Sequence, residues 1–168
     1  MTPTLIHYST APLTAVHSVE QTADGRNDKP TGLWFSVGDD EDGWRAWCED
    51  NMAEWIKDRI VTEVVLTPTA KMLRLTGAEQ IDAFTAEYSV TPTWASGMGE
   101  RGSLFERYAI DWRRVASEYQ GIIIAPYVWS RRIDDAARWY YGWDCASGCL
   151  WDAAAVASLK QRTAELAE

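Results

Sequence analysis

The residues of this chain that could do chemistry are a histidine near its start, His7, and the large aromatic rings that follow it. His7 lies in LIHYST, and Trp34 follows 27 residues later in TGLWFS, ahead of Trp44 and Trp47. The chain has ten tryptophans in 168 residues. Indole rings supply broad, stiff apolar faces with one hydrogen-bond donor each. The pattern therefore suits either a packed core or a pocket for a flat ligand.

These motifs resemble the ADP-ribosyltransferase superfamily, in the branch with a His-Tyr-Glu triad that includes diphtheria toxin and the poly-ADP-ribose polymerases. HYST at 7–10 is similar to the first motif of that family, a histidine on the first strand followed by Tyr, Gly, Ser or Thr. GLWFS at 32–36 is similar to the second motif, a glycine–hydrophobic–aromatic–Phe–small strand followed by a helix that carries an aromatic residue about ten positions on. Trp44 and Trp47 fit that helix, and the resemblance covers residues 5–48 best.

The resemblance implies that NAD is the substrate and that its nicotinamide ring stacks between Trp34 and either Trp44 or Trp47. Each such stack contributes about 1 kcal/mol beyond burial. Trp34 departs from the family's tyrosine, because an indole keeps the stacking face but lacks the phenol. His7 would donate to a ribose hydroxyl. The expected NAD-contacting residues are His7, Tyr8, Ser9, Gly32, Trp34, Ser36, Trp44 and Trp47.

The resemblance also implies a carboxylate that stabilises the oxocarbenium-like state as the nicotinamide–ribose bond breaks. The family's glutamate lies on a late strand, and in WDCASGCLWD its position falls near Ser147 or Gly148, neither of which is acidic. Asp144 and Asp152 are the available acids. We predict Asp144, because it precedes a turn of small residues where a pocket wall could bring it toward the ligand. The predicted catalytic set is His7, Trp34 and Asp144.

Other interpretations of the same residues stay open. Trp34, Trp44 and Trp47 could fill a core, and Asp144 could cap a turn. A small, acidic, Trp-rich domain also fits a non-enzymatic interaction protein, for example a phage-encoded inhibitor that binds a host protein through an exposed aromatic patch. A third possibility is an enzyme that processes free nucleosides or bases in the same pocket. A chain without a competent acid would bind NAD-like ligands and transfer nothing.

Composition excludes several classes of protein. A net charge of −9 disfavours binding to nucleic acid, so a protein is the expected acceptor of ADP-ribose. No apolar run of about 18 residues or signal-peptide pattern occurs, which predicts a cytoplasmic protein that binds no membrane. Three cysteines fit a reducing compartment. A zinc site at Cys145 and Cys149 is disfavoured because the chain has only two histidines, so no metal cofactor is expected.

The expected architecture is a single α+β domain spanning 1–168, because strands and helices follow each other without regular βαβ alternation. The resemblance implies a split antiparallel or mixed sheet with flanking helices. Strands are predicted at 3–9, 32–37, 62–68, 71–77 and 121–127, the last being central. Helices are predicted at 43–57 (capped by Asp42), 77–88 and 111–119. A mobile segment is predicted at 89–103, a second aromatic-rich region at 137–152, and a helix or a strand followed by a helix at 153–168.

Overall fold

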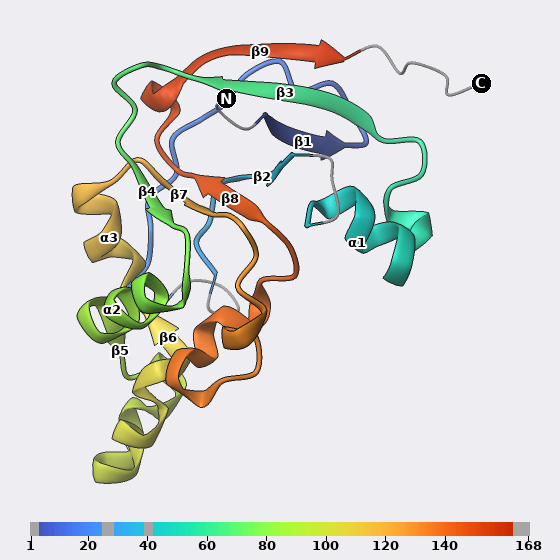
Figure 1. Ribbon diagram of the computed structural model, residues 1–168. Helices are drawn as coiled ribbons and strands as arrows, with labels where there is room; N and C mark the ends of the chain where they lie inside the picture. The colour runs from blue at the N-terminus through green and yellow to red at the C-terminus, as the bar shows by residue number, and fades with distance from the viewer. Residues whose placement is uncertain (1–3, 25–28, 39–41, 163–168) are drawn as a thin grey trace.

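A seven-stranded mixed sheet organises the chain in the computed structural model, which describes residues 4–24, 29–38 and 42–162 (Figure 1). The strand order is β4-β7-β8-β2-β1-β3-β9. A two-stranded sheet pairs β5 with β6. The strands are β1 (Leu5–Ser9), β2 (Leu33–Val37), β3 (Ile60–Leu66), β4 (Met72–Leu75), β5 (Ser89–Val90), β6 (Ala109–Ile110), β7 (Gly121–Ile124), β8 (Ser147–Leu150) and β9 (Val156–Arg162).

The helices are divided between two regions of the sheet. Figure 1 shows α2 (Ala78–Tyr88) and α3 (Trp112–Glu118) beside β4 and β7, whereas α1 (Trp44–Asn51) lies toward β1 and β2. None of the helices in the described ranges has the length and apolar character needed to cross a membrane. Short 3-10 segments complete the fold, namely η1 (Ala53–Trp55), η2 (Thr93–Tyr108), η3 (Trp129–Arg131), η4 (Asp135–Gly142) and η5 (Ala153–Ala155).

The α+β class is confirmed, and so is the interior position of the 121–127 segment. β7 lies between β4, to which it runs parallel, and β8, to which it runs antiparallel. All four of its residues are buried. An apolar run with no polar face is what a strand covered on both sides requires.

The helix predicted at 43–57 is shorter than expected. α1 ends at Asn51, and Met52 then leaves helical geometry with φ −150° and ψ 58°. Gly43, not Asp42, is the N-cap, and no side chain caps the helix. The Asp42 carboxylate instead accepts from the backbone N–H of Tyr127 at 3.3 Å. Asp42, which the local sequence predicted to cap the helix, therefore contacts a residue far away in the sequence.

Two further segments that the sequence described only in outline contain defined elements. The segment predicted to be mobile, 89–103, contains β5 and most of the 3-10 segment η2. The Ala-rich segment from 153 forms one 3-10 turn and then β9, which pairs antiparallel with β3 along most of its length. Backbone pairing with a neighbouring strand outweighs the helix propensity of alanine there. Residue 3 of the first predicted strand and 163–168 of the last predicted segment lie outside the described residues.

The tryptophans separate into a buried group and an accessible group. Trp112, Trp139, Trp143 and Trp151 belong to the core, where they pack against Phe84 and one another. Core filling is therefore the correct interpretation for these four rings. The accessible group is half-buried or exposed and consists of Trp34, Trp44, Trp47, Trp55, Trp94 and Trp129.

Two glycines allow β2, β7 and β8 to approach closely. A Cβ on Gly32 would lie 2.2 Å from the carbonyl oxygen of Leu150, and the φ of Gly32 is +154°. A Cβ on Gly148 would lie 2.5 Å from the carbonyl of Ile122 and 2.5 Å from the ring of Phe35. Any side chain at these positions would push the backbone of one strand away from the next. Gly32, predicted to contact NAD, has a structural reason to be glycine.

Replacing Gly32 by alanine should destabilise the fold, because the methyl group meets backbone rather than a movable side chain. We expect a loss of at least about 2 kcal/mol in the free energy of unfolding, measured by urea denaturation. Gly97→Ala is the matched control, since a Cβ there meets nothing within 4 Å. It should change the unfolding free energy by less than about 0.5 kcal/mol. Equal effects of the two substitutions would contradict the close approach of β2 and β8.

Candidate functional site

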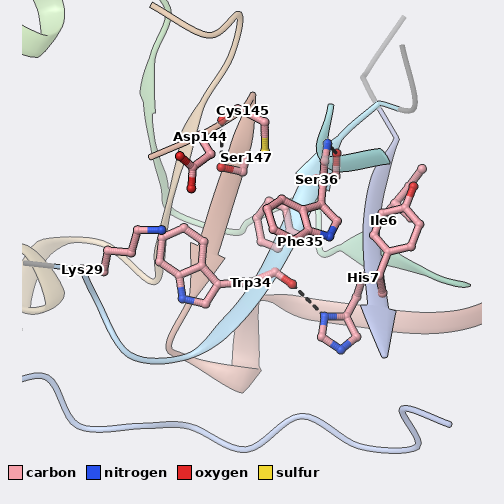
Figure 2. A pocket seen from close by; sticks show the side chains of 11 residues that line it. Ile6, His7, Lys29, Trp34, Phe35, Ser36, Asp144, Cys145 and Ser147 are labelled. Atoms are coloured by element: carbon pink, nitrogen blue, oxygen red, sulfur yellow. Dashed lines mark hydrogen bonds between the residues drawn. The ribbon is translucent and has the colours of Figure 1, made fainter. Parts of the chain in front are cut away.

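A cavity of about 280 Å³ lies where β1, β2 and β8 meet the start of α1 (Figure 2). Six of the nine residues predicted for the site line it, although they come from segments far apart in the sequence. These six are His7, Tyr8, Trp34, Ser36, Trp44 and Asp144. The other lining residues are Ile6, Lys29, Phe35, Cys145 and Ser147.

Strand register explains why these side chains share one cavity. Ile6 of β1 lies opposite Ser36 of β2, and Ser36 lies opposite Ser147 of β8. Directly opposed residues of antiparallel strands point to the same face, and residues two apart on one strand do likewise. Tyr8 and Trp34 therefore join the same face. The cavity lies beside this face of the sheet, and His7 and Phe35, which alternate with these residues along β1 and β2, also line it.

His7 is fixed at the point where the β1–β2 ladder ends. The ladder pairs Leu5 with Val37 and Ile6 with Ser36. The Nδ1 atom of His7 then lies 2.7 Å from the carbonyl oxygen of Trp34. A carbonyl can only accept, so Nδ1 carries the proton, and in the neutral ring Nε2 is an acceptor. The sequence predicted that His7 would act as a donor, whereas this hydrogen bond leaves Nε2 of a neutral ring free to accept.

Trp34 meets a cation that sequence reasoning missed. The Nζ atom of Lys29 lies 4.8 Å from the centroid of the Trp34 ring, and Figure 2 shows the amine beside that ring. The Trp34 ring also meets buried Trp143 edge-on, with centroids 4.8 Å apart. Burial lowers the pKa of Lys29, and the charge of Asp144 acts in the opposite direction. The only hint in the sequence was a lysine placed directly before the turn that leads into TGLWFS.

Trp44 lines the cavity and Trp47 does not. The two rings stack on each other at 5.0 Å with an interplanar angle of 12°, and Trp55 packs against both. The backbone N–H of Trp44 donates to the hydroxyl of Ser36 at 2.8 Å, which ties the start of α1 to β2. Trp47 thus supports Trp44 from behind. Ser9 is also absent from the lining, and its hydroxyl donates to the carbonyl of Ala11.

Of the two candidate acids, only Asp144 lines the cavity. Its carboxylate accepts from Arg132 at 3.0 Å, and Arg132 also donates to the phenol of Tyr127. Burial raises the pKa of Tyr127. Asp152 instead accepts from the side chain of Gln120 at 2.7 Å and caps η5. That hydrogen bond from Gln120 lowers the pKa of Asp152. Asp152 therefore has a structural role in another part of the sheet.

No acid stands on β8 itself. The hydroxyl of Ser147 lines the cavity and donates to the carbonyl of Cys145 at 2.9 Å. Gly148 has no room for any side chain. Burial raises the pKa of the Cys145 thiol to about 12, and burial also raises the pKa of Cys149. Both thiols are therefore protonated at neutral pH and unsuited to nucleophilic attack.

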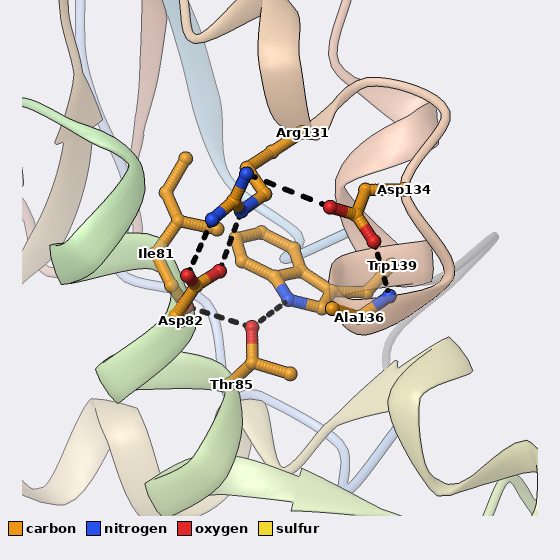
Figure 3. A network of polar contacts seen from close by, with 7 residues as sticks. All are labelled: Ile81, Asp82, Thr85, Arg131, Asp134, Ala136 and Trp139. Carbon is orange, nitrogen blue, oxygen red and sulfur yellow. Dashed lines mark hydrogen bonds and ion pairs between the residues drawn. The ribbon is translucent and has the colours of Figure 1, made fainter.

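Arg131, the neighbour of Arg132, belongs to a structural ion-pair network. Its guanidinium makes two hydrogen bonds of 2.6 Å to Asp82 on α2 and a 3.5 Å ion pair to Asp134 (Figure 3). Beside this network the indole N–H of Trp139 donates to the hydroxyl of Thr85. These contacts fasten η3 and η4 to α2. Arg131 is thus committed to the fold.

No family model, curated protein or solved structure matches the chain. Within the described ranges, no three His, Cys, Asp or Glu side chains gather where they could hold a metal ion. The geometry of the cavity is therefore the basis on which a function can be assigned.

The Asp82–Arg131 pair predicts a pH-dependent contribution to stability. The hydrogen bond from Arg131 lowers the pKa of Asp82 below its ordinary value of 3.8. The pair therefore stabilises the fold fully above that ordinary value, and the contribution is lost as the pH falls through the lowered pKa of the folded state. Asp82→Asn should lower the free energy of unfolding at pH 7 by about 1 kcal/mol, because the pair is partly exposed and screened.

Urea denaturation at pH 7 and at pH 2.5 measures this effect. The difference between the native protein and Asp82→Asn should be smaller at the lower pH. Asp135→Asn is a suitable control, because Asp135 is exposed and takes no part in the network. A difference that does not shrink at pH 2.5 would show that the substitution acts through packing and not through charge.

Proposed function

We propose that the protein is an ADP-ribosyltransferase-like enzyme that binds NAD in this cavity, cleaves the nicotinamide–ribose bond and passes ADP-ribose to a protein acceptor or to water. One observation carries the proposal. The aromatic residues, the histidine and the acid predicted from separate parts of the sequence line a single cavity. Residues taken at random from the surface would not be expected to line one cavity.

The size and lining of the cavity suit the ring end of a dinucleotide. Its volume of about 280 Å³ holds a flat ring with its substituents, and the remaining nucleotide would lie outside. Trp34 and Trp44 offer aromatic faces to that ring. The unprotonated nitrogen of His7 would accept from a ribose hydroxyl. Ser36 already accepts from Trp44 and donates to the carbonyl of Gly38, so its hydroxyl positions α1.

The proposed chemistry requires a negative charge near the breaking bond. As nicotinamide leaves, positive charge develops on the ribose, and a carboxylate in a water-poor site stabilises that charge more than it stabilises the ground state. Asp144 would supply this carboxylate. Its ion pair with Arg132 fixes the orientation of the carboxylate and also offsets part of its charge. Such an arrangement predicts slow turnover.

Asp144→Asn should therefore lower the rate of nicotinamide release from NAD by about 100-fold, the usual cost of removing one electrostatic stabiliser of a transition state. The affinity for NAD should change much less, because stacking provides the binding. Nicotinamide release measured by chromatography and NAD affinity measured by calorimetry separate the two effects. Asp152→Asn, the other candidate acid, is the matched control and should leave the rate unchanged.

Several outcomes would reject the proposal. If NAD is not cleaved by the native protein and does not bind to it, the enzyme assignment is wrong. Binding of NAD with no cleavage would leave a nucleotide-binding protein that lacks a competent acid. Preference for free nucleosides over NAD would indicate a nucleoside-processing enzyme in the same cavity.

A non-enzymatic interaction protein is the second candidate, and exposed tryptophans favour it. Trp55 is 49% exposed, Trp94 57% and Trp129 63%. Indole rings are enriched at protein interfaces, and the acidic chain would select a basic partner. Trp55→Ser and Trp129→Ser should abolish binding to such a partner without affecting NAD cleavage, because neither residue lines the cavity.

A further inference from the structure

Lys29 occupies the position where the ligand ring is expected to stack. Its ammonium lies over the Trp34 ring, 4.8 Å from the centroid, and its side chain lines the cavity. A ring that stacks on this face must therefore lie against the ammonium or displace it. In both cases, the ligand atoms nearest to Lys29 belong to a substituent of the ring.

Within the part of the chain that the structure describes, no acid forms an ion pair with the ammonium of Lys29. Among the residues that the structure describes, Asp144 is the acid whose charge acts most on Lys29, but Asp144 forms its ion pair with Arg132. Burial disfavours the charged form of Lys29, which lowers its pKa. A partly desolvated cation without a partner is costly in a stable fold. An anion supplied by the ligand would compensate this cost.

The charges around the cavity distinguish between two related ligand rings, nicotinamide and nicotinate. Lys29 and Asp144 line this end of the cavity, and the charge of Asp144 is already paired with Arg132, so the positive charge of Lys29 is left in excess. The nicotinamide ring of NAD is itself cationic and carries a neutral carboxamide, so it adds to the excess positive charge. A nicotinate ring differs only in bearing a carboxylate where nicotinamide bears the carboxamide. That carboxylate would pair with Lys29 while the ring cation still faces Asp144.

We propose that Lys29 makes the cavity selective for a nicotinate ring, so that the deamidated form of NAD is the preferred dinucleotide. This inference rests on the proposed function, since it assumes that a pyridine dinucleotide occupies the cavity. When the carboxamide becomes a carboxylate, an ion pair with a charge-assisted hydrogen bond replaces the weaker hydrogen bond from Lys29 to a neutral carboxamide oxygen. We expect nicotinic acid adenine dinucleotide to bind at least about tenfold more tightly than NAD.

Isothermal titration calorimetry with these two dinucleotides tests the proposal on the intact chain. In Lys29→Met, which keeps the length of the side chain and removes its charge, the two ligands should bind within about twofold of each other. Lys71→Met is the matched control, because Lys71 is exposed and lies outside the cavity. It should keep the full preference. Lys29→Gln serves as a second variant if the methionine substitution impairs folding, which circular dichroism would reveal.

The outcomes separate this inference from the function on which it rests. If the native protein binds NAD as tightly as the deamidated form or more tightly, the role of Lys29 is wrong and the NAD proposal stands. A preference that persists in both Lys29 variants would also overturn the role of Lys29. If neither dinucleotide binds to the native protein, both proposals fail.

Discussion

The position of β2 between β1 and β8 is the constraint on which the site depends. β2 carries Trp34 and Ser36, and its two neighbours bring His7 on one side and Ser147 on the other. The approach of β8 is so close that Gly32 has no space for a methyl group. Because the side chains of a strand alternate between its two faces, a shift of one position in the β2–β8 pairing would remove Ser147 from the face that Ser36 occupies.

The ladder also explains why a cavity forms at this place rather than another. Backbone pairing of β1 with β2 ends at Ile6 and Ser36, and the imidazole of His7 then takes the next free carbonyl. Where pairing continues, as between β7 and β8, neighbouring side chains fill the sheet surface and the residues are buried. The end of the ladder leaves polar groups and half-buried rings beside an open volume. One hydrogen bond therefore both closes the strand pairing and fixes the tautomer of the histidine that faces the site.

Local patterns predicted the elements with strong periodicity or strong breakers. The apolar run at 121–124 indicated an interior strand, and Gly77 with the apolar positions Ile81 and Phe84 indicated α2. The motifs around His7 and Trp34 predicted much of the cavity lining. Sequence offered a strand at 153–168 as one of two alternatives and could not choose between them, because the pairing of β9 with β3 depends on residues about 100 positions away. It also could not separate Trp34 from Trp143, since both belong to aromatic clusters and only tertiary packing decides which ring is covered.

Lys29 and Asp144 show why a site is harder to predict than a core. Neither follows a hydrophobic period, and each is placed by a loop whose course is set by the strands on either side. Lys29 is a partly buried charge beside an aromatic ring, which disfavours the folded state. Asp144 is held in an ion pair with Arg132. A fold selected only for stability would place apolar groups here, as it does around Trp112 and Trp139. Charged groups placed beside a cavity, in a chain whose buried described residues are mostly apolar, mark the position where a ligand with complementary charges would be accommodated.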